Sequence, residues 1–272
     1  MSAPKINGLL PVAVRAARAA GREILEVYAG ADFGVEIKSD RSPLTIADRR
    51  AHRAIVEGLT ASGLPVLSEE GRDIFYDERR GWAAFWMVDP LDGTKEFIKR
   101  NGEFTVNIAL IRDGTPVLGV VFAPVLDVLY AAREGLGAYK IKNSGGKEEI
   151  SEEEILRIGM QLPLARKAGP FRVVASRSHM TAETLAFVDA EKDARGAVEL
   201  VSVGSSLKLC LVAEGTADVY PRFGPTMEWD TAAGDAVARA AGCMVTRTDG
   251  TDPLLYNKED LHNPWFVVRR NI

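Results

Sequence analysis

Two aspartates that lie three residues apart, Asp89 and Asp92, carry the clearest chemical signal in the chain. The apolar residues 85–88 before them predict a buried strand that ends at Pro90, because proline cannot donate to a strand ladder. Two carboxylates this close repel each other, so a fold keeps them where a cation lies between them or where water solvates both. Mg²⁺ prefers such oxygen ligands. The pair therefore predicts a magnesium site, and the alternative is a solvated acidic turn in which Asp92 caps a helix.

The residues that follow the pair, Gly93 and 94–98, predict a tight turn and the first turn of a helix. The backbone N–H groups of a first helical turn lack partners within the helix, and here they would face the same point as the carboxylates, where they could bind a phosphate. A metal beside such a turn outlines a site for phosphoryl transfer.

Three more carboxylates are predicted at the ends of secondary-structure elements. Asp48 follows Thr45 at the start of a helix, where it either completes a capping box or orients a nucleophilic water. Glu69 follows the short apolar strand 64–67, and Asp230 begins a later helix. Helix starts favour aspartate in any protein, so the combination is more informative than one member. We expect these carboxylates to converge with the aspartate pair in one site.

The composition is that of a soluble globular protein with a large core. The 272 residues are 46% hydrophobic and 26% charged, which allows one large domain or two closely joined halves. The net charge of −4 gives no support for nucleic-acid binding through a broad basic face. Cys210 and Cys243 imply no disulfide framework and fit a reducing compartment. No apolar run approaches the length that spans a bilayer, and arginines interrupt the N-terminal apolar stretch, which argues against a secretory leader.

The elements that must position these residues change in character along the chain. The first half, 1–145, has an amphipathic helix at 10–28, a second helix at 45–59 and successive strands that suggest a mostly antiparallel sheet. In the second half, 146–272, strands alternate with helices, which is typical of an α/β arrangement. The predicted strands are 64–67, 85–88, 104–112, 116–122, 125–133, 137–142, 171–175, 198–203, 217–222, 243–248 and 266–269, and the helices of the second half are 181–190, 204–214 and 230–241.

Three sequence blocks resemble the inositol monophosphatase superfamily of Mg²⁺-dependent, lithium-sensitive phosphatases. The blocks are Ser68-Glu69-Glu70, Asp89-Pro90-Leu91-Asp92-Gly93-Thr94 and Trp229-Asp230-Thr231-Ala232-Ala233-Gly234, and their order and separation fit that family. Other stretches are similar to its branch of CysQ-type 3′(2′),5′-bisphosphate nucleotidases. They are residues 95–104, Ser176-Arg177-Ser178-His179, Gly204-Ser205-Ser206-Leu207-Lys208 and residues 220–226. The resemblance covers nearly the whole chain, and residues 142–167 are the main exception.

This resemblance implies an α+β fold, a layered α-β-α-β-α sandwich with a mostly antiparallel first sheet, a mixed second sheet and the site between the halves. It implies two or three Mg²⁺ ions, with Asp89 bridging two of them. The implied ligands are Glu69, Asp89, the backbone carbonyl of Leu91, Asp92 and Asp230. Asp48 and Thr94 would orient and deprotonate the attacking water, with Glu69 as a further catalytic residue. Gly93 and Thr94 would offer backbone N–H groups to the transferred phosphate.

A second phosphate on the substrate needs binding residues of its own. Ser205 and Lys208 lie three residues apart and share a helix face, and Arg222 offers a planar fork that suits phosphate. The resemblance adds His179 as a nucleotide contact. The alternatives are a helix cap for Ser205, surface cations for Lys208 and Arg222, and an ordinary loop residue for His179. The implied substrate-binding set is Leu91, Asp92, Gly93, Thr94, His179, Ser205, Lys208, Arg222 and Asp230.

These inferences predict a Mg²⁺-dependent phosphatase that hydrolyses the 3′-phosphate of adenosine 3′,5′-bisphosphate (PAP) to AMP and phosphate in sulfur assimilation. The related phosphosulfate (PAPS) is a second candidate substrate, and water would attack directly without a phosphoenzyme. One rival is an inositol monophosphatase with the same metal site. Another is a phosphatase with a nucleophilic aspartate, although two residues rather than one separate Asp89 from Asp92. A third is a non-enzymatic binding protein for a phosphorylated metabolite.

The partner that these readings share is a small phosphorylated molecule rather than nucleic acid. The resemblance implies a cytoplasmic protein. It leaves open a peripheral attachment to the inner membrane and the choice between a monomer and a homodimer.

Overall fold

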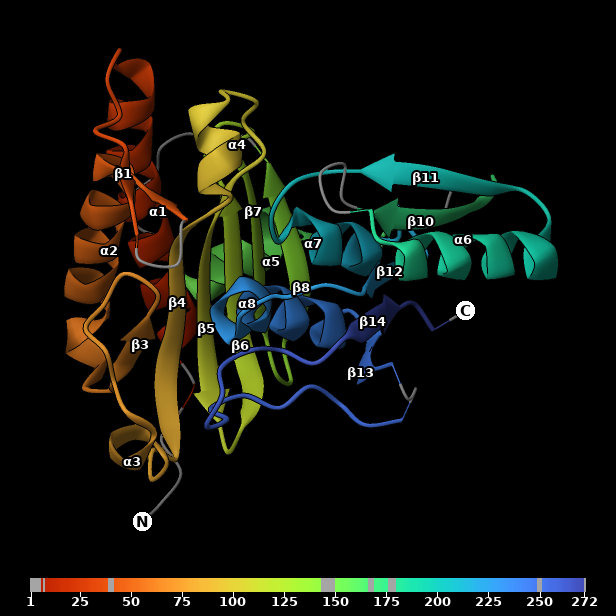
Figure 1. Ribbon diagram of the computed structural model, residues 1–272. Coiled ribbons are helices and arrows are strands. Elements are labelled where there is room, and N and C mark those ends of the chain that lie inside the picture. Colours follow the sequence, from red (N-terminus) through yellow and green to blue (C-terminus); the bar gives the residue numbers. More distant parts are fainter. Residues whose placement is uncertain are drawn as a thin grey trace.

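The protein folds into five stacked layers of helices and sheets (Figure 1). The computed structural model describes residue 6 and residues 8–38, 42–142, 150–165, 169–175, 180–248 and 251–271. An outer layer of helices, a larger sheet, a central pair of helices, a smaller sheet and one more outer helix follow one another across the molecule. This order confirms the layered α-β-α-β-α fold.

The larger sheet has the strand order β3-β4-β5-β6-β7-β8-β9. Its neighbouring strands are antiparallel except for β3 and β4, which are parallel. The predicted hairpin between β5 and β6 is present, with Asp113 and Gly114 both at positive φ. The strands are β3 (Val66–Ser68), β4 (Ala84–Asp92), β5 (Thr105–Arg112), β6 (Thr115–Ala123), β7 (Val128–Arg133), β8 (Gly137–Lys142) and β9 (Met160–Gln161).

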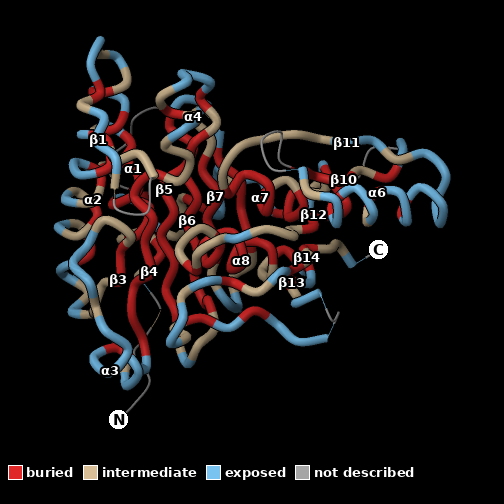
Figure 2. Tube along the Cα trace, in the orientation of Figure 1, coloured by how far each residue is buried: buried red, intermediate tan, exposed pale blue. Residues whose placement is uncertain are grey.

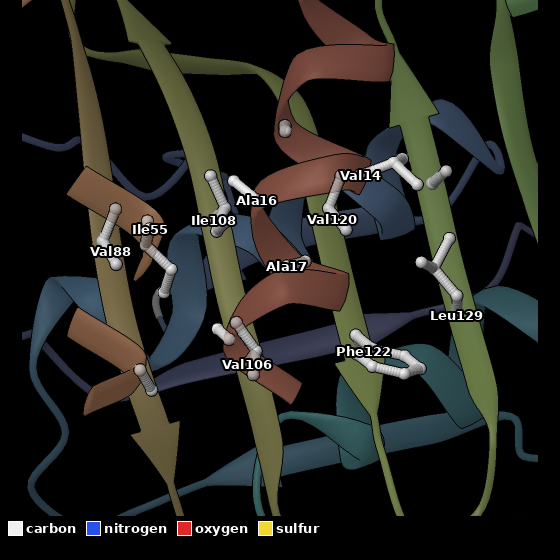
Figure 3. Packing of buried hydrophobic residues seen from close by; sticks show 14 of the residues in the cluster. Val14, Ala16, Ala17, Ile55, Val88, Val106, Ile108, Val120, Phe122 and Leu129 are labelled. Carbon is white, nitrogen blue, oxygen red and sulfur yellow. The ribbon is translucent and has the colours of Figure 1, made fainter. Parts of the chain in front are cut away.

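Helices α1 (Leu9–Ala29) and α2 (Ile46–Leu59) cover one face of this sheet. Their buried residues recur at helical spacing and pack on alternate residues of β4 to β7, which Figure 3 shows from close by. Gly21 brings α1 close to β6, since a Cβ at that position would lie 2.4 Å from the Phe122 ring. The short helix α5 (Glu152–Ile158) adds its buried face to the same core.

The central layer consists of α7 (Leu207–Glu214) and α8 (Glu228–Ala240). A second core cluster contains buried side chains of both helices and of both sheets, and Figure 2 shows this middle of the molecule as its most continuously buried part. Helix α8 lies so close to β6 that a Cβ on Gly119 would be 2.4 Å from the Ala233 carbonyl oxygen. Glycine at that position therefore sets the depth of α8 on the larger sheet.

The smaller sheet has the strand order β11-β10-β12-β14-β13 and is mixed. Strand β10 is parallel to β11 and β12, and β14 is antiparallel to β12 and β13. These strands are β10 (Phe171–Ala175), β11 (Val198–Ser202), β12 (Val219–Arg222), β13 (Met244–Arg247) and β14 (Phe266–Arg269). Helix α6 (Ala182–Arg195) forms the outermost layer. The remaining elements are β1 (Glu36–Ile37), β2 (Pro43–Leu44), the short 3-10 helix Thr60–Ser62, α3 (Tyr76–Arg79) and α4 (Thr94–Ile98).

Several predicted boundaries were wrong. Strand β4 passes through Pro90 and ends at Asp92, because proline lies where the register with β5 shifts and no regular ladder bond is needed. Strand β7 begins at Val128 rather than 125, since a turn with Asp127 at φ 44° precedes it. The short strand β9, which the sequence did not predict, pairs with β8 and extends the larger sheet. Helix α6 extends past residue 190 to Arg195.

A buried ion pair joins the larger sheet to the central layer. Lys140 on β8 pairs with Glu214 at the end of α7, and both residues are buried. Burying two charges is costly unless they are paired, so this contact requires β8 and α7 to remain together.

Candidate active site

The site begins at an irregularity in β4 that places two carboxylates on one face. Asp89 pairs with Asn107 of β5 and Asp92 pairs with Thr105, so three steps along β4 correspond to two along β5. In a regular strand, residues three apart point to opposite faces of the sheet. The extra residue in β4 restores the phase, because Thr105 and Asn107 share a face and their partners face the same way.

Asp89 has a strongly raised pKa, and it is only 2% exposed. Its pKa is raised well above the usual range by burial and, after that, by the charges of Glu69, Asp92 and Asp230. Burial followed by repulsion from Asp92 also raises the pKa of Asp230 to about 8. Carboxylates from β4, the end of β3 and α8 are therefore close enough to influence one another's pKa.

Each of these carboxylates has a donor within the protein. Asp89 Oδ1 accepts from Leu91 N over 3.0 Å, and Asp230 Oδ2 accepts from Met227 N over 2.8 Å. Glu69 Oε1 accepts from Lys38 Nζ over 2.9 Å, and Lys38 also pairs with Glu70. Burial raises the pKa of Glu69, and the Lys38 charge opposes that shift.

Asp48 forms the capping box that was one of the two alternatives from the sequence, and it also contacts Thr94. Its Oδ2 accepts from Thr45 N over 2.7 Å and from the Thr45 hydroxyl over 2.6 Å, which completes the capping box. Its Oδ1 accepts from the Thr94 hydroxyl over 3.3 Å, and that hydroxyl also lies 3.4 Å from the Leu91 carbonyl oxygen. Burial raises the pKa of Asp48. The helix cap and the contact with Thr94 therefore use different oxygens of one carboxylate.

A cavity of about 250 Å³ opens beside the acidic group, between β4, α4, α7 and β12. Its walls carry opposite charges. The predicted substrate-binding residues among its lining are Asp92, Gly93, Ser205, Lys208, Arg222 and Asp230. Lys208 is 8% exposed, and its Nζ donates to the Ser205 carbonyl oxygen over 2.6 Å. Burial lowers the pKa of Lys208, against the opposing effect of the Asp92 charge.

Arg222 forms the other cationic part of the cavity wall. Its Nη2 donates to the Pro225 carbonyl oxygen over 2.8 Å. Its Nε is buried and has no hydrogen-bond partner within the described part of the chain. The guanidinium therefore lines the cavity while its Nε is enclosed by the protein.

Sequence comparison shows the family to which the chain with this arrangement belongs. The sequence pattern described as the inositol monophosphatase family matches residues 6–266. The chain belongs to this family. It is 49% identical over 256 residues to the 3′(2′),5′-bisphosphate nucleotidase CysQ of Shigella flexneri, which covers 93% of this chain and 96% of that protein. The protein of the same name from Escherichia coli strain K12 gives the same values.

Solved structures agree with the family assignment. CysQ from Bacteroides thetaiotaomicron, described as a bacterial member of the inositol monophosphatase family, superimposes with a TM-score of 0.91 at 53% identity over 98% of both chains. The extragenic suppressor protein suhB from Bartonella henselae gives a TM-score of 0.75 at 25% identity, covering 97% of this chain and 95% of that one.

Members of the inositol monophosphatase family depend on a metal ion, generally Mg²⁺. The donor chemistry here fits such an ion, because buried carboxylates that raise one another's pKa need a positive charge among them. Within the described ranges, no three acidic, histidine or cysteine side chains are arranged around one point at ligating distance. The hydrogen bonds described above use only one carboxylate oxygen each of Glu69, Asp89 and Asp230. The side chains would have to rotate to bring oxygens around one ion.

Sequence reasoning missed the polar group that joins the acidic residues to α7. The Ser206 hydroxyl lies 2.8 Å from Asp92 Oδ2 and 2.6 Å from the Asp230 carbonyl oxygen. Asn107 Nδ2 donates to Ser206 Oγ over 2.8 Å, and Asn107 Oδ1 accepts from the Thr105 hydroxyl over 3.0 Å. The available signal was the alternation of Thr105 and Asn107 in an otherwise apolar strand, which marks a polar stripe on one face.

One predicted site residue, His179, lies outside the described residues. No helix in the described part of the chain has both the length and the apolar composition needed to cross a membrane.

Proposed function

We propose that this member of the inositol monophosphatase family is a metal-dependent 3′(2′),5′-bisphosphate nucleotidase, which converts adenosine 3′,5′-bisphosphate to AMP and phosphate. The observation that carries the proposal is the cavity in which two cations, Lys208 and Arg222, lie beside Asp92 and Asp230. A simple monoester needs only the part of the cavity lined by Asp92 and Asp230, the acidic end. A substrate with two phosphates can also use the part lined by Lys208 and Arg222, the cationic end. Nucleotidases 49% identical over 93% of the chain support the same assignment.

The proposed Mg²⁺ ligands are the carboxylates already described, together with one backbone carbonyl. They are Glu69, Asp89, the carbonyl of Leu91, Asp92 and Asp230. When bound, Mg²⁺ neutralises the phosphate dianion and lowers the pKa of the attacking water. The pKa values of Asp89 and Asp230, raised by burial and mutual repulsion, support this assignment because a cation would relieve both effects.

We assign the orientation of the attacking water to Thr94 and Asp48. The Thr94 hydroxyl donates to Asp48 Oδ1, so its oxygen is free to accept a hydrogen bond from a water. Asp48 can take up the proton that the water loses, since burial already favours its protonated form. Backbone N–H groups of Gly93 and Thr94 are proposed to bind the transferred phosphate, which leaves without forming a covalent link to an aspartate.

The second phosphate is assigned to the cationic end of the cavity. Arg222 offers a planar guanidinium there, and Lys208 adds a compact charge on the adjoining wall. Ser205 lines the same cavity and holds Lys208 through its carbonyl oxygen. His179 remains a sequence prediction for a nucleotide contact.

The decisive experiment compares phosphate release from adenosine 3′,5′-bisphosphate and from inositol 1-phosphate, each with Mg²⁺, with EDTA and with added Li⁺. We expect Mg²⁺-dependent, Li⁺-sensitive release from the nucleotide and little release from the inositol ester. The opposite preference would favour the inositol phosphatase and remove the role of the cationic end. Tight nucleotide binding without turnover on either substrate would favour a binding protein instead.

The biological setting that we propose is sulfur assimilation in the cytoplasm, with PAPS as a second substrate that would give the corresponding 5′-phosphosulfate. Rates on the two nucleotides, measured in parallel, test that substrate range. Vesicle sedimentation tests a peripheral attachment to the inner membrane, and light scattering distinguishes a monomer from a homodimer.

A further inference from the structure

A fully buried carboxylate outside the proposed ligand set lies at the start of α8. Glu228 is 0% exposed and precedes Asp230 by two residues. Burial raises its pKa, and hydrogen bonds and the charge of Lys258 oppose the shift. A buried charge of this kind is retained only with several good partners, so its contacts indicate what it holds in place.

The hydrogen-bond partners of the Glu228 side chain all belong to the segment 257–258. Glu228 Oε2 accepts from Asn257 N over 2.5 Å. Its Oε1 accepts from Lys258 N over 3.0 Å and from Lys258 Nζ. In addition, Glu228 N donates to the Leu261 carbonyl oxygen over 2.9 Å. The first turn of α8 is thus bound through side chain and backbone to one irregular segment.

That segment is itself fixed from its other side. Arg79 of α3 is buried, and its guanidinium donates to Asn257 Oδ1 over 2.9 Å, to the Lys258 carbonyl oxygen over 2.6 Å and to the Glu259 carbonyl oxygen over 3.0 Å. Asn257 has φ 72°, a left-handed conformation that asparagine tolerates better than most residues, and its Nδ2 donates back to the Arg79 carbonyl oxygen over 2.9 Å. Glu228 therefore binds a rigid support rather than a loose loop.

The same turn carries Asp230 and its link to the other acidic residues. Asp230 Oδ2 is held by Met227 N, and the Asp230 carbonyl oxygen lies 2.6 Å from the Ser206 hydroxyl, which also contacts Asp92. Asn263 Nδ2 donates to the Met227 carbonyl oxygen over 2.7 Å and fixes the turn from a second direction. A shift of this turn would therefore move Asp230 relative to Asp92.

We propose that Glu228 is a positioning residue, which through Asn257 and Lys258 holds the first turn of α8 so that the Asp230 carboxylate lies at the correct place for the metal ion. The inference rests on the proposed function, because it takes Asp230 as a metal ligand. It adds a supporting segment, 257–263, far from Asp230 in sequence and anchored on α3 by Arg79.

The same helix supplies a matched control. Asp235 is also 0% exposed, its Oδ1 accepts from Arg239 Nε over 2.6 Å, and its Oδ2 accepts from the Tyr256 hydroxyl over 2.8 Å. Like Glu228, Asp235 is buried and has a cationic partner, Arg239. It also contacts Tyr256, which directly precedes the segment that Glu228 binds. It lies more than one helical turn beyond Asp230, so its loss should lower stability without displacing that residue.

The experiment measures Mn²⁺ binding without substrate, by the electron paramagnetic resonance signal of free Mn²⁺, in the full-length wild type, Glu228→Gln and Asp235→Asn. We expect the Mn²⁺ dissociation constant to rise about tenfold in Glu228→Gln, as is usual for residues that support metal ligands. In Asp235→Asn the Mn²⁺ dissociation constant should stay within about twofold of the wild-type value, even if the melting temperature falls as far as it does in Glu228→Gln. Equal weakening in both variants, or no weakening in Glu228→Gln, would overturn the proposal.

Two further variants separate the possible failures. Lys258→Met removes the cation but keeps both backbone donors to Glu228, and it replaces Glu228→Gln if that variant does not fold. We expect it to weaken Mn²⁺ binding by about threefold to tenfold, and an unchanged constant would then count against the inference. Asp230→Asn tests the underlying assignment: unaltered Mn²⁺ binding there would refute the ligand role of Asp230, and with it the metal site as proposed, whatever Glu228→Gln does.

Discussion

The two ends of the cavity carry buried charges of opposite sign and come from different parts of the fold. The acidic end is built on β4 of the larger sheet and on α8, whereas the cationic end comes from Lys208 on α7 and Arg222 on β12 of the smaller sheet. Buried carboxylates call for a cation, and buried cations call for an anion. We therefore assign the proposed chemical step to β4 and α8, and recognition of the substrate to α7 and β12.

Removing a carboxylate from the acidic end should have the largest effect. Asp92→Asn keeps the shape of the side chain but removes a charge that repels Asp89 and Asp230 and that we assign to the metal. We expect phosphate release from the bisphosphate to fall by about a thousandfold or more, with no recovery at high Mg²⁺. The exposed carboxylate in Asp77→Asn is the control. Normal Mg²⁺-dependent rates in Asp92→Asn would refute the assignment.

Removing a cation from the other end should separate substrates rather than stop chemistry. In Arg222→Ala, kcat/KM for adenosine 3′,5′-bisphosphate should fall about thirtyfold, because a charge-assisted contact with the second phosphate is lost. The value for 3′-AMP, which lacks that phosphate, should change far less. Lys99→Ala removes an exposed cation from the same cavity wall and should affect both substrates little. Equal losses on the two substrates in Arg222→Ala would remove the proposed role.

The smallest of these effects is expected at Ser206, which lies between the acidic residues and α7. Ser206→Ala removes the hydroxyl that contacts both Asp92 and the Asp230 carbonyl oxygen. The Mg²⁺ concentration for half-maximal rate should rise about fivefold to tenfold, since this contact orients a proposed ligand without replacing it. Titrating Mg²⁺ at saturating nucleotide measures the change. Ser151→Ala, which removes the exposed serine cap of α5, is the control. A Mg²⁺ dependence equal to that of wild type in Ser206→Ala would contradict the link between the ends.

The sequence predicted the elements well where periodicity is strong and less well where the backbone is irregular. Helix α1 followed from apolar spacing and α2 from its capping residues, and the layered order followed from the family resemblance. The path of β4 through Pro90 did not, because a register shift depends on the partner strand rather than on local residue types. That shift is what turns Asp89 and Asp92 to one face.

The candidate site shows the same limit. Residues within the three family blocks could be assigned roles from the sequence, and those roles remain predictions. Asn107 and Glu228 could not be assigned, because their importance lies in contacts with Ser206 and with residues 257–258, which are distant in the chain. A buried carboxylate in a helix start looks like an ordinary first-turn residue until its partners are known.

Helices α7 and α8 bury side chains against both sheets within one core cluster. The Lys140–Glu214 pair also joins α7 to β8 of the larger sheet. Neither sheet can expose its inner face without uncovering the same two helices, so the halves should lack separate stabilities. We expect the protein to unfold in a single cooperative transition. Fluorescence from variants that retain only Trp86, in the larger sheet, or only Trp265, beside β14, should therefore report one common midpoint.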